Sequence, residues 1–260
     1  MKYQIETISA SKLGTYNGAF GCPKKFWFRY VLGLQSKWKG TSLAIGIGVG
    51  RALQVSGVGS AGASLAKWFG TWESYCHEVW QDIHPDDKLG REKMVDKGKD
   101  MLRAFYTSGI RSIGGIPECE VRRVFRCPDT GEELAEYVGF LDWYDPVLHR
   151  ITELKTVAAH KSHDTWLLQL SLYQWATEEE DRESAKISLV QINRAKTPRV
   201  KSEEVHLSDN QNLWIKRCVS KTIASIRDQH FYERPSFACK SCDFREACID
   251  GNYSNLIERS

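Results

Sequence analysis

One stretch decides the fold of this chain: Gly139-Phe140-Leu141-Asp142, then Glu153-Leu154-Lys155, then Gln169 and Tyr173. Alternating apolar residues predict strands over 134–144 and 150–156, and a helical period predicts a helix over about 165–178. Asp142 then lies near the end of one strand, while Glu153 and Lys155 share a face of the next. Gln169 and Tyr173 are four residues apart, so they lie on one face of the helix.

The paired acids of this stretch suit a divalent metal. Two carboxylates near the facing ends of adjacent strands form a hard-oxygen site for Mg²⁺ or Mn²⁺, which bind through one or two carboxylates plus substrate phosphate. Lys155 can position and deprotonate an attacking water and stabilise charge on a phosphoryl group. Gln169 and Tyr173 can orient Lys155 or contact the substrate backbone. Because a lone Glu-x-Lys is usually a solvated strand face, the ordered set is what indicates chemistry.

Length and composition indicate a single globular domain. The chain has 260 residues, 42% hydrophobic and 27% charged, with a net charge of +3. This length buries a sizeable core without disulfides, and the mild charge means that any DNA-binding surface must be local. No apolar run matches a membrane span, and the first residues lack the apolar core of a signal peptide. These features predict a cytoplasmic protein without membrane contact.

The order of the expected elements is that of an α/β protein. Besides the elements above, we expect helices over 9–16, 44–55 and, on both sides of a connection at 86–93, within 65–106; strands over 118–126, 186–193 and 201–207; and a helix that Asp209 caps and that ends near Gln229. This pattern predicts a mixed central β-sheet flanked by helices. Within one domain over 1–260, we expect a helical N-terminal part (1–110), a core (115–207) and a C-terminal helix with a cysteine cluster (209–260).

Half of the eight cysteines are clustered. Cys239, Cys242 and Cys248 follow a Cys-x2-Cys-x5-Cys pattern, and Cys22 near the other end of the chain is the candidate fourth ligand. Clustered cysteines in a reducing compartment indicate metal or redox chemistry. Four thiolates suit either a tetrahedral zinc ion or an iron–sulfur cluster, and the spacing alone does not separate the two. The remaining cysteines are expected to be buried thiols: Cys76, Cys119, Cys127 and Cys218.

Cations and aromatics are interleaved in residues 24–30. The cations are Lys24, Lys25 and Arg29, and such a composition suits contact with phosphates and stacked bases. We therefore expect these three residues to bind DNA. A helix whose aromatics enter the core while its lysines face solvent explains the same pattern, and both interpretations can hold on opposite faces.

The ordered set in residues 139–173 resembles the PD-(D/E)xK nuclease superfamily, in particular its RecB-like exonuclease branch. The resemblance implies a restriction-endonuclease-like core and a metal-dependent deoxyribonuclease that hydrolyses phosphodiester bonds in DNA. It also implies that Asp142, Glu153 and the Leu154 carbonyl bind the divalent metal. Lys155 matches the catalytic lysine of the superfamily. The additional motif of the branch is matched by Gln169 and Tyr173.

The cysteine pattern resembles the iron–sulfur nucleases of the AddB type and the CRISPR-adaptation type. In those proteins a 4Fe–4S cluster joins the two ends of the chain around the nuclease core. The Ser9-x-Ser11-x-Leu13 opening before Cys22 resembles the same branch. The resemblance implies a stand-alone exonuclease of a prokaryote or a phage, acting on single-stranded or free DNA ends in recombination, repair or CRISPR adaptation. It would work as a homo-oligomer or with proteins of those pathways.

One position departs from the pattern of the branch. A histidine usually follows the N-terminal cysteine in a helix, but Gly50 stands at that place, and Gln54 stands where an acid is usual. One metal position then lacks its ligand, and Glu120 is a candidate replacement. Two functions stay open: an active exonuclease, or a catalytically weakened DNA-binding module with a zinc or iron–sulfur clamp. A third hypothesis is a structural partner in a recombination complex whose cysteines hold zinc.

Overall fold

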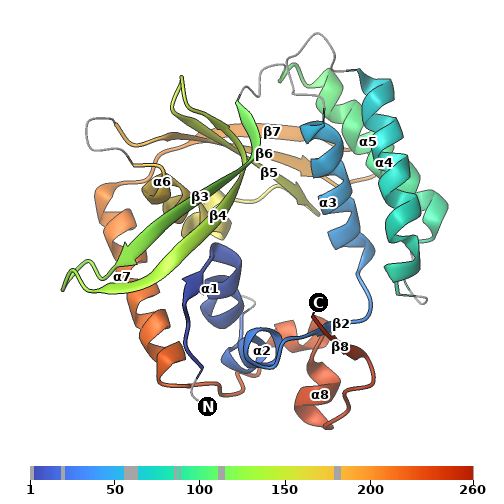
Figure 1. Cartoon of the computed structure of the whole chain (residues 1–260). Helices are drawn as coiled ribbons and strands as arrows, with labels where there is room; N and C mark the ends of the chain where they lie inside the picture. The colour runs from blue at the N-terminus through green and yellow to red at the C-terminus, as the bar shows by residue number, and fades with distance from the viewer. Residues whose placement is uncertain are drawn as a thin grey trace.

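The computed structural model of the chain describes residues 3–18, 21–55, 64–84, 87, 89–110, 115–178 and 183–259. Figure 1 shows a central sheet with helices on both sides and, below it, segments from the two ends of the chain lying together. The expected α/β class with a mixed central sheet is confirmed. Within the described ranges, no helix combines the length and the apolar character needed to cross a membrane.

A six-stranded mixed sheet forms the centre of the molecule. Its strands are β1 (Thr7–Ile8), β3 (Ile116–Arg126), β4 (Glu133–Asp145), β5 (Arg150–Val157), β6 (Lys186–Asn193) and β7 (Val200–Val205). β3 and β5 pair antiparallel with β4, β6 runs parallel to β5, and β7 pairs antiparallel with β6. The apolar residues of β6 suit a central strand that is covered on both faces. Most of β5 is buried as well, although it carries Glu153 and Lys155.

The two edges of the long strand β4 are paired differently. Along one edge, β4 pairs with β3 over its length. Along the second edge, β1 pairs parallel at Glu136 and Tyr137, and β5 pairs only at Trp143–Asp145. Residues 138–142 lie between these pairings and have no strand partner on this edge in the part of the chain that the structure describes. The sheet is therefore open at the level of Asp142.

Helices cover both faces of this sheet (Figure 1). One core contains α1 (Ala10–Asn17), α6 (Leu167–Ala176) and α7 (Asp209–Arg227), and the other contains α3 (Thr41–Gln54), α4 (Leu65–Val79) and α5 (Arg91–Thr107). Successive residues of β6 show the division, because Leu189 packs into the first core and Val190 into the second. Short 3₁₀ turns lie at Trp80–Asp82, His163–Trp166 and Phe237–Ser241.

Segments from both ends of the chain form a smaller third unit. It contains α2 (Pro23–Phe26), a π-helical turn (Trp27–Val31), β2 (Leu34–Ser36), α8 (Arg245–Ile249) and β8 (Leu256–Glu258). β2 and β8 pair antiparallel. The ring of Phe28 stacks on that of Phe244 with centroids 5.3 Å apart, and both side chains are buried. These contacts hold the N-terminal and C-terminal segments together.

Two differences from the expected elements have local causes. The N-cap of α7 is Ser208 and not Asp209, because Ser208 Oγ accepts the N–H of Gln211 while the Gln211 side chain accepts the N–H of Ser208. This reciprocal pair is a capping box. Strands β1, β2 and β8 were not expected, because two or three residues are too few to show an alternating pattern.

Candidate active site

Gly139 is required by the side chain of Tyr137, two residues earlier on β4. Both residues lie on the buried face of the strand. A Cβ atom at position 139 would lie 2.7 Å from the hydroxyl oxygen of Tyr137 and 2.9 Å from its ring. A larger residue would therefore displace the ring from a closely packed core. The glycine of the Gly-x-x-Asp pattern thus has a steric cause.

Asp142 lies where β4 and β5 separate. Its Oδ2 accepts a hydrogen bond from the backbone N–H of Leu154 at 2.8 Å. Burial raises the pKa of Asp142 to about 8, the Glu153 carboxylate adds to the rise, and the Leu154 amide and the Lys155 ammonium oppose it. The Glu153 carboxylate therefore disfavours the ionisation of Asp142, and a divalent cation between the two groups would relieve this repulsion.

Glu153, Lys155, Gln169 and Tyr173 form one connected polar network. Lys155 Nζ donates to Glu153 Oε1 at 2.5 Å and to Gln169 Oε1 at 2.8 Å. The amide nitrogen of Gln169 donates to Glu153 Oε1 at 3.0 Å and to the Tyr173 hydroxyl at 2.7 Å. Tyr173 donates in turn to the carbonyl of Phe140 at 2.6 Å. The network ties α6 to both strands and fixes the ammonium of Lys155. It brings together the predicted catalytic residues of β5 and α6.

The donor set beside this network fits a hard divalent cation. Glu153 is buried, and its Oε2 has no hydrogen-bond partner among the described residues, although a buried carboxylate oxygen without a partner is costly. No group of three or more His, Cys, Asp or Glu side chains is arranged as a metal site in the described ranges. A cation here would therefore rely on Asp142, Glu153, the Leu154 carbonyl and oxygens of substrate or water.

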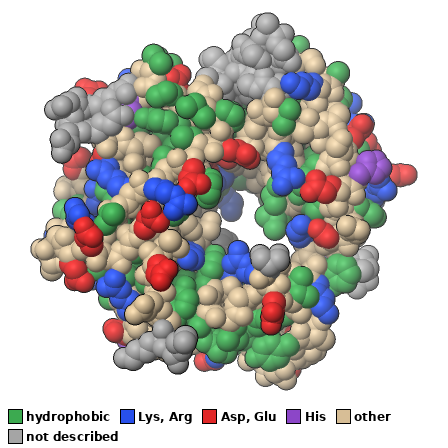
Figure 2. Space-filling view, in the orientation of Figure 1, with side chains coloured by type: hydrophobic (Ala, Val, Ile, Leu, Met, Phe, Trp, Pro, Cys, Tyr) green, Lys and Arg blue, Asp and Glu red, His purple; other side chains and the backbone are tan. Residues whose placement is uncertain are grey.

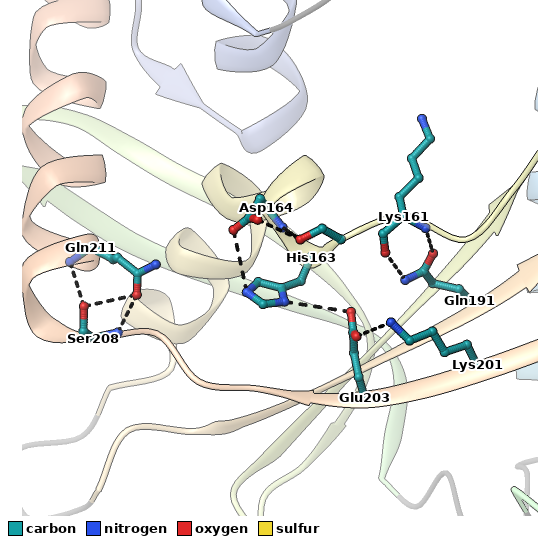
Figure 3. A network of polar contacts seen from close by, with 9 residues as sticks. Lys161, His163, Asp164, Gln191, Lys201, Glu203, Ser208 and Gln211 are labelled. Carbon is teal, nitrogen blue, oxygen red and sulfur yellow. Dashed lines mark hydrogen bonds and ion pairs between the residues drawn. The ribbon is translucent and has the colours of Figure 1, made fainter.

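A second polar network holds the segment that leads from β5 into α6 (Figure 3). The buried side chain of Gln191 on β6 accepts the N–H of Lys161 at 2.9 Å and donates to its carbonyl at 2.8 Å. Next in this segment, His163 Nδ1 lies 3.9 Å from Glu203 Oε1 on β7. These contacts fix the turn before α6 and, with it, the position of Gln169.

A cavity of about 610 Å³ is lined by the network of predicted catalytic residues, and we name it the catalytic cavity for that reason. Figure 2 shows the molecule hollowed at the centre of the face drawn, with Lys and Arg side chains around the hollow. The cavity lining also includes residues that the sequence did not assign to it, namely Ser9, Ser11, Lys12, Arg122, Tyr137 and Phe140. Among these residues, only Ser9 and Ser11 belong to a pattern that could be recognised in the sequence. Their position at this cavity depends on the short strand β1.

The four clustered cysteines line a second cavity, of about 390 Å³. Burial raises the pKa of the Cys248 thiol, and the nearby Cys22 and Cys242 add to the rise. The donors therefore fit a group that takes four thiolates. The described thiols do not form a closed set of ligands around a single ion. They line a cavity that lies between them. The cavity lining includes Cys239 as well.

Three of the four scattered cysteines differ from expectation. Cys76 is buried in the core of α4, but Cys119, Cys127 and Cys218 are partly exposed. Cys119 and Cys127 lie on and just after β3, which is an edge strand, and Cys218 lies on the outer helix α7. An edge strand and an outer helix leave part of such side chains open to solvent.

Lys24, Lys25 and Arg29 lie near the cysteine cavity, and none of them is in the lining of the catalytic cavity. Lys24 Nζ is 3.4 Å from Glu233, and Arg29 is 3.3 Å from Asp243. Two of the interleaved aromatics are buried, namely Phe26 and Phe28. The buried aromatics agree with the alternative interpretation, and two of the three cations pair with acids. The expected contact of the three cations with DNA stays a prediction.

Gly50 lies on α3. Apart from the backbone of the helix itself, no heavy atom of the described residues lies within 4 Å of the position that its Cβ would take. One turn earlier, the Cβ position of Gly46 is 3.0 Å from Thr156 Oγ1 on β5, so this face of α3 packs on the catalytic strand. The helix contains no His, Asp or Glu. Glu120 binds Arg122 and is absent from the cavity lining. The described chain therefore offers no replacement for the missing histidine from either element.

Comparison with known proteins agrees with this site. The model of the PD-(D/E)XK nuclease superfamily matches residues 7–249. The chain therefore belongs to the PD-(D/E)XK nuclease superfamily and is a nuclease.

Two solved structures are similar to the chain. The crystal structure described as "Putative exonuclease" from Eubacterium rectale has a TM-score of 0.64 at 14% identity, and the alignment covers 95% of this chain and 94% of that one. It shares the fold. SSO0001 is 16% identical over 83% of this chain and 87% of its own, and its TM-score of 0.39 is too low to support an argument. The search of curated proteins gives no match.

Proposed function

We propose that the protein is a divalent-metal-dependent DNA exonuclease that hydrolyses phosphodiester bonds at single-stranded ends. The observation that carries the proposal is the position of the Lys155 ammonium, which Glu153 and Gln169 hold in the catalytic cavity beside Asp142. This arrangement agrees with the roles implied by the RecB-like branch. We also propose that residues 1–260 form a single nuclease domain.

In this proposal, Asp142, Glu153 and the Leu154 carbonyl would hold Mg²⁺ or Mn²⁺. When bound, the cation supplies Lewis-acid polarisation of the phosphoryl oxygen. Lys155 positions the attacking water and stabilises the negative charge that develops on the phosphoryl group. Asp142 must first lose the proton that its raised pKa retains, because a carboxyl group binds a cation in its ionised form.

Cleavage of labelled single-stranded and double-stranded DNA in Mn²⁺ tests the proposal. We expect the wild-type protein to degrade single-stranded ends and Lys155→Ala to be slower by about 100-fold or more, with DNA affinity retained. Lys161→Ala is the matched control, because Lys161 is exposed, lies outside the cavity lining and directs its side chain away from the neighbouring network in Figure 3. Equal rates for the Lys155 variant and the wild type would contradict the proposal.

We further propose that Cys22, Cys239, Cys242 and Cys248 hold a 4Fe–4S cluster. The shared cavity at the junction of the two chain ends supports it, and so does the resemblance to iron–sulfur nucleases in recombination, repair or CRISPR adaptation. Zinc is the alternative metal. Anaerobic purification followed by a visible spectrum and metal analysis decides between them, because a cluster gives iron, sulfide and broad visible absorption. A colourless protein that contains zinc would contradict the cluster.

A catalytically weakened DNA-binding module is the second candidate function. It is favoured by α3, which presents no imidazole or carboxylate at Gly50 or elsewhere along its length. This alternative predicts salt-sensitive DNA binding without turnover. Multiple turnovers by the metal-loaded protein in the assay above would exclude it.

A further inference from the structure

We propose that the first turn of α1 and the hydroxyl of Tyr137 form a phosphate-binding subsite for the DNA strand, beside the catalytic network. The inference rests on the nuclease function proposed above. It specifies which part of the substrate this region binds: a backbone phosphodiester next to the one that is cleaved.

The start of α1 lies beside the unpaired segment of β4. Thr7 and Ile8 of β1 lie opposite Glu136 and Tyr137, and the two strands run in the same direction. Because α1 begins at Ala10, its first turn follows β1 to the level at which β4 has no strand partner on this edge. The lining of the catalytic cavity includes every residue over 7–12. The N-terminus of α1 therefore opens into the space that holds the two carboxylates.

The first turn of α1 offers donors that the protein itself does not use. Ser9 Oγ accepts the N–H of Lys12 at 3.2 Å, and the Ser9 carbonyl accepts the N–H of Leu13 at 3.0 Å. Within the described part of the chain, the N–H groups of Ala10 and Ser11 have no recorded acceptor. The turn contains no acidic residue, and the Ser11 side chain is exposed. Free amides at the positive end of a helix favour an anion.

The hydroxyl of Tyr137 is a second and independent sign of a ligand. The side chain is fully buried and lines the same cavity, yet its hydroxyl has no hydrogen-bond partner among the described residues. The hydroxyl reaches along β4 to Gly139, where it lies 2.7 Å from the position of a Cβ atom. A buried phenol without a partner costs stability. An acceptor oxygen that enters the cavity with the substrate would satisfy it.

The chemistry of these groups selects a phosphodiester over a base or a sugar. They are backbone amides and hydroxyls. Lys12 lines the cavity with them, although its ammonium already donates to the carbonyl and the hydroxyl of Thr7. Arg122 lines it too, although Glu120 and Glu136 already bind its guanidinium. A phosphodiester presents two charged acceptor oxygens to such donors and positions a strand without reading its sequence. The subsite would therefore set the register of the strand relative to Lys155.

Two substitutions separate binding from folding. Ser11→Asp places a carboxylate in the first turn of α1, where it favours the helix dipole but repels a phosphate. Tyr137→Phe removes a buried hydroxyl that has no partner in the protein. Both variants should keep or raise the melting temperature while they weaken DNA binding. Asn210→Asp is the matched control, because it adds the same charge at the same position of α7, which also has a serine N-cap and lies outside the cavity lining.

The probe is a fluorescein-labelled single-stranded oligodeoxynucleotide, and its anisotropy is measured in EDTA so that no cleavage occurs. We expect Ser11→Asp to weaken binding by about tenfold or more, as the loss of a charge-assisted contact implies. Tyr137→Phe should weaken it several-fold, and Asn210→Asp should leave it unchanged. In a series of probes, one neutral methylphosphonate linkage replaces a different phosphodiester in each. The wild type should bind one probe of the series less tightly than the others. Ser11→Asp should bind all of them equally, whatever the position of the linkage.

Each outcome decides the matter. The subsite is overturned if both variants bind the DNA probe with wild-type affinity. It is also overturned if the variants lose affinity and melting temperature together. A wild-type protein that does not bind DNA overturns the subsite and the exonuclease together. If the wild type binds with the expected pattern but does not cleave in Mn²⁺, the exonuclease fails and the subsite stands. If it cleaves while both variants bind normally, the subsite alone fails.

Discussion

The side chain of Asp142 bridges β4 and β5 where the two strands separate, with Oδ2 2.8 Å from the amide nitrogen of Leu154. The pairing of these strands ends at Trp143 and Thr152, so this bond is the next cross-strand contact beyond the ladder. It holds the carboxyl group close to Glu153. A single residue thus joins two strands and titrates at the catalytic cavity.

The metal-free protein should lose stability as the pH rises. The pKa of Asp142 is raised from 3.8 to about 8, so between these values the native state keeps a proton that the unfolded state has released. The free energy of unfolding should therefore fall by up to about 1.4 kcal/mol per pH unit over that interval. Urea unfolding of EDTA-treated protein across the pH range measures the slope. Asp142→Asn should flatten it, and identical slopes for both proteins would refute the assignment.

Gly139→Ala should destabilise the fold, because its Cβ would lie 2.7 Å from the buried hydroxyl of Tyr137. Overpacking of this kind costs about 1–3 kcal/mol. Gly70→Ala in α4 is the control. In the part of the chain that the structure describes, only the helix backbone lies near that Cβ position, and the helix should gain up to about 1 kcal/mol. Denaturant unfolding compares the two variants. A Gly139 variant as stable as the wild type would show that the core has room for the methyl group.

If the missing histidine limits metal binding at the site, Gly50→His should restore a metal ligand. Outside the helix backbone, the described residues place no heavy atom within 4 Å of this Cβ position, so α3 has room for a side chain to begin there. We expect tighter Mn²⁺ binding by calorimetry and faster cleavage than in the wild type. Gly50→Ala controls for the gain in helix propensity, which is about 1 kcal/mol. Equal Mn²⁺ affinity in the histidine and alanine variants would show that this helix position does not reach the metal.

Cys22→Ser should remove the metal group at the cysteine cavity and lower the melting temperature of the anaerobically purified protein. A group bound only by the native state stabilises that state. Cys22 lines the cavity and would be the ligand that the N-terminal segment supplies to the proposed cluster. Cys127→Ser is the control, because Cys127 lies in the turn after β3, outside that cavity. The visible spectrum, metal content and melting temperature are measured together. Unchanged metal content in Cys22→Ser would remove this residue from the ligand set.

The catalytic strands could be predicted because their signals are local. The alternation around Asp142 and Glu153 defines strands, and the four-residue spacing of Gln169 and Tyr173 places both on one face of α6. Gly139 could be recognised from its pattern, but its steric cause required the position of the Tyr137 ring.

The lining of the catalytic cavity could not be predicted in the same way, because it depends on contacts between distant segments. Ser9 and Ser11 reach the cavity only through the pairing of the two-residue strand β1 with β4. The acid partners of Lys24 and Arg29 could not be predicted either, because they lie over two hundred positions later in the chain, as the contact between Arg29 and Asp243 shows. No local pattern reports such a partner.

The pairing of β2 with β8 sets an order of events during synthesis of the protein. Leu34 and Glu258 are opposite each other in the ladder, so residues 34–36 can find their partner strand only after residues 256–258 have been synthesised. Until then Phe28 lacks the ring of Phe244 and remains exposed on the nascent chain. Contacts of such long range are slow to form, and exposed apolar surface favours aggregation. Chaperone demand should therefore persist until Phe244 and β8 have been synthesised.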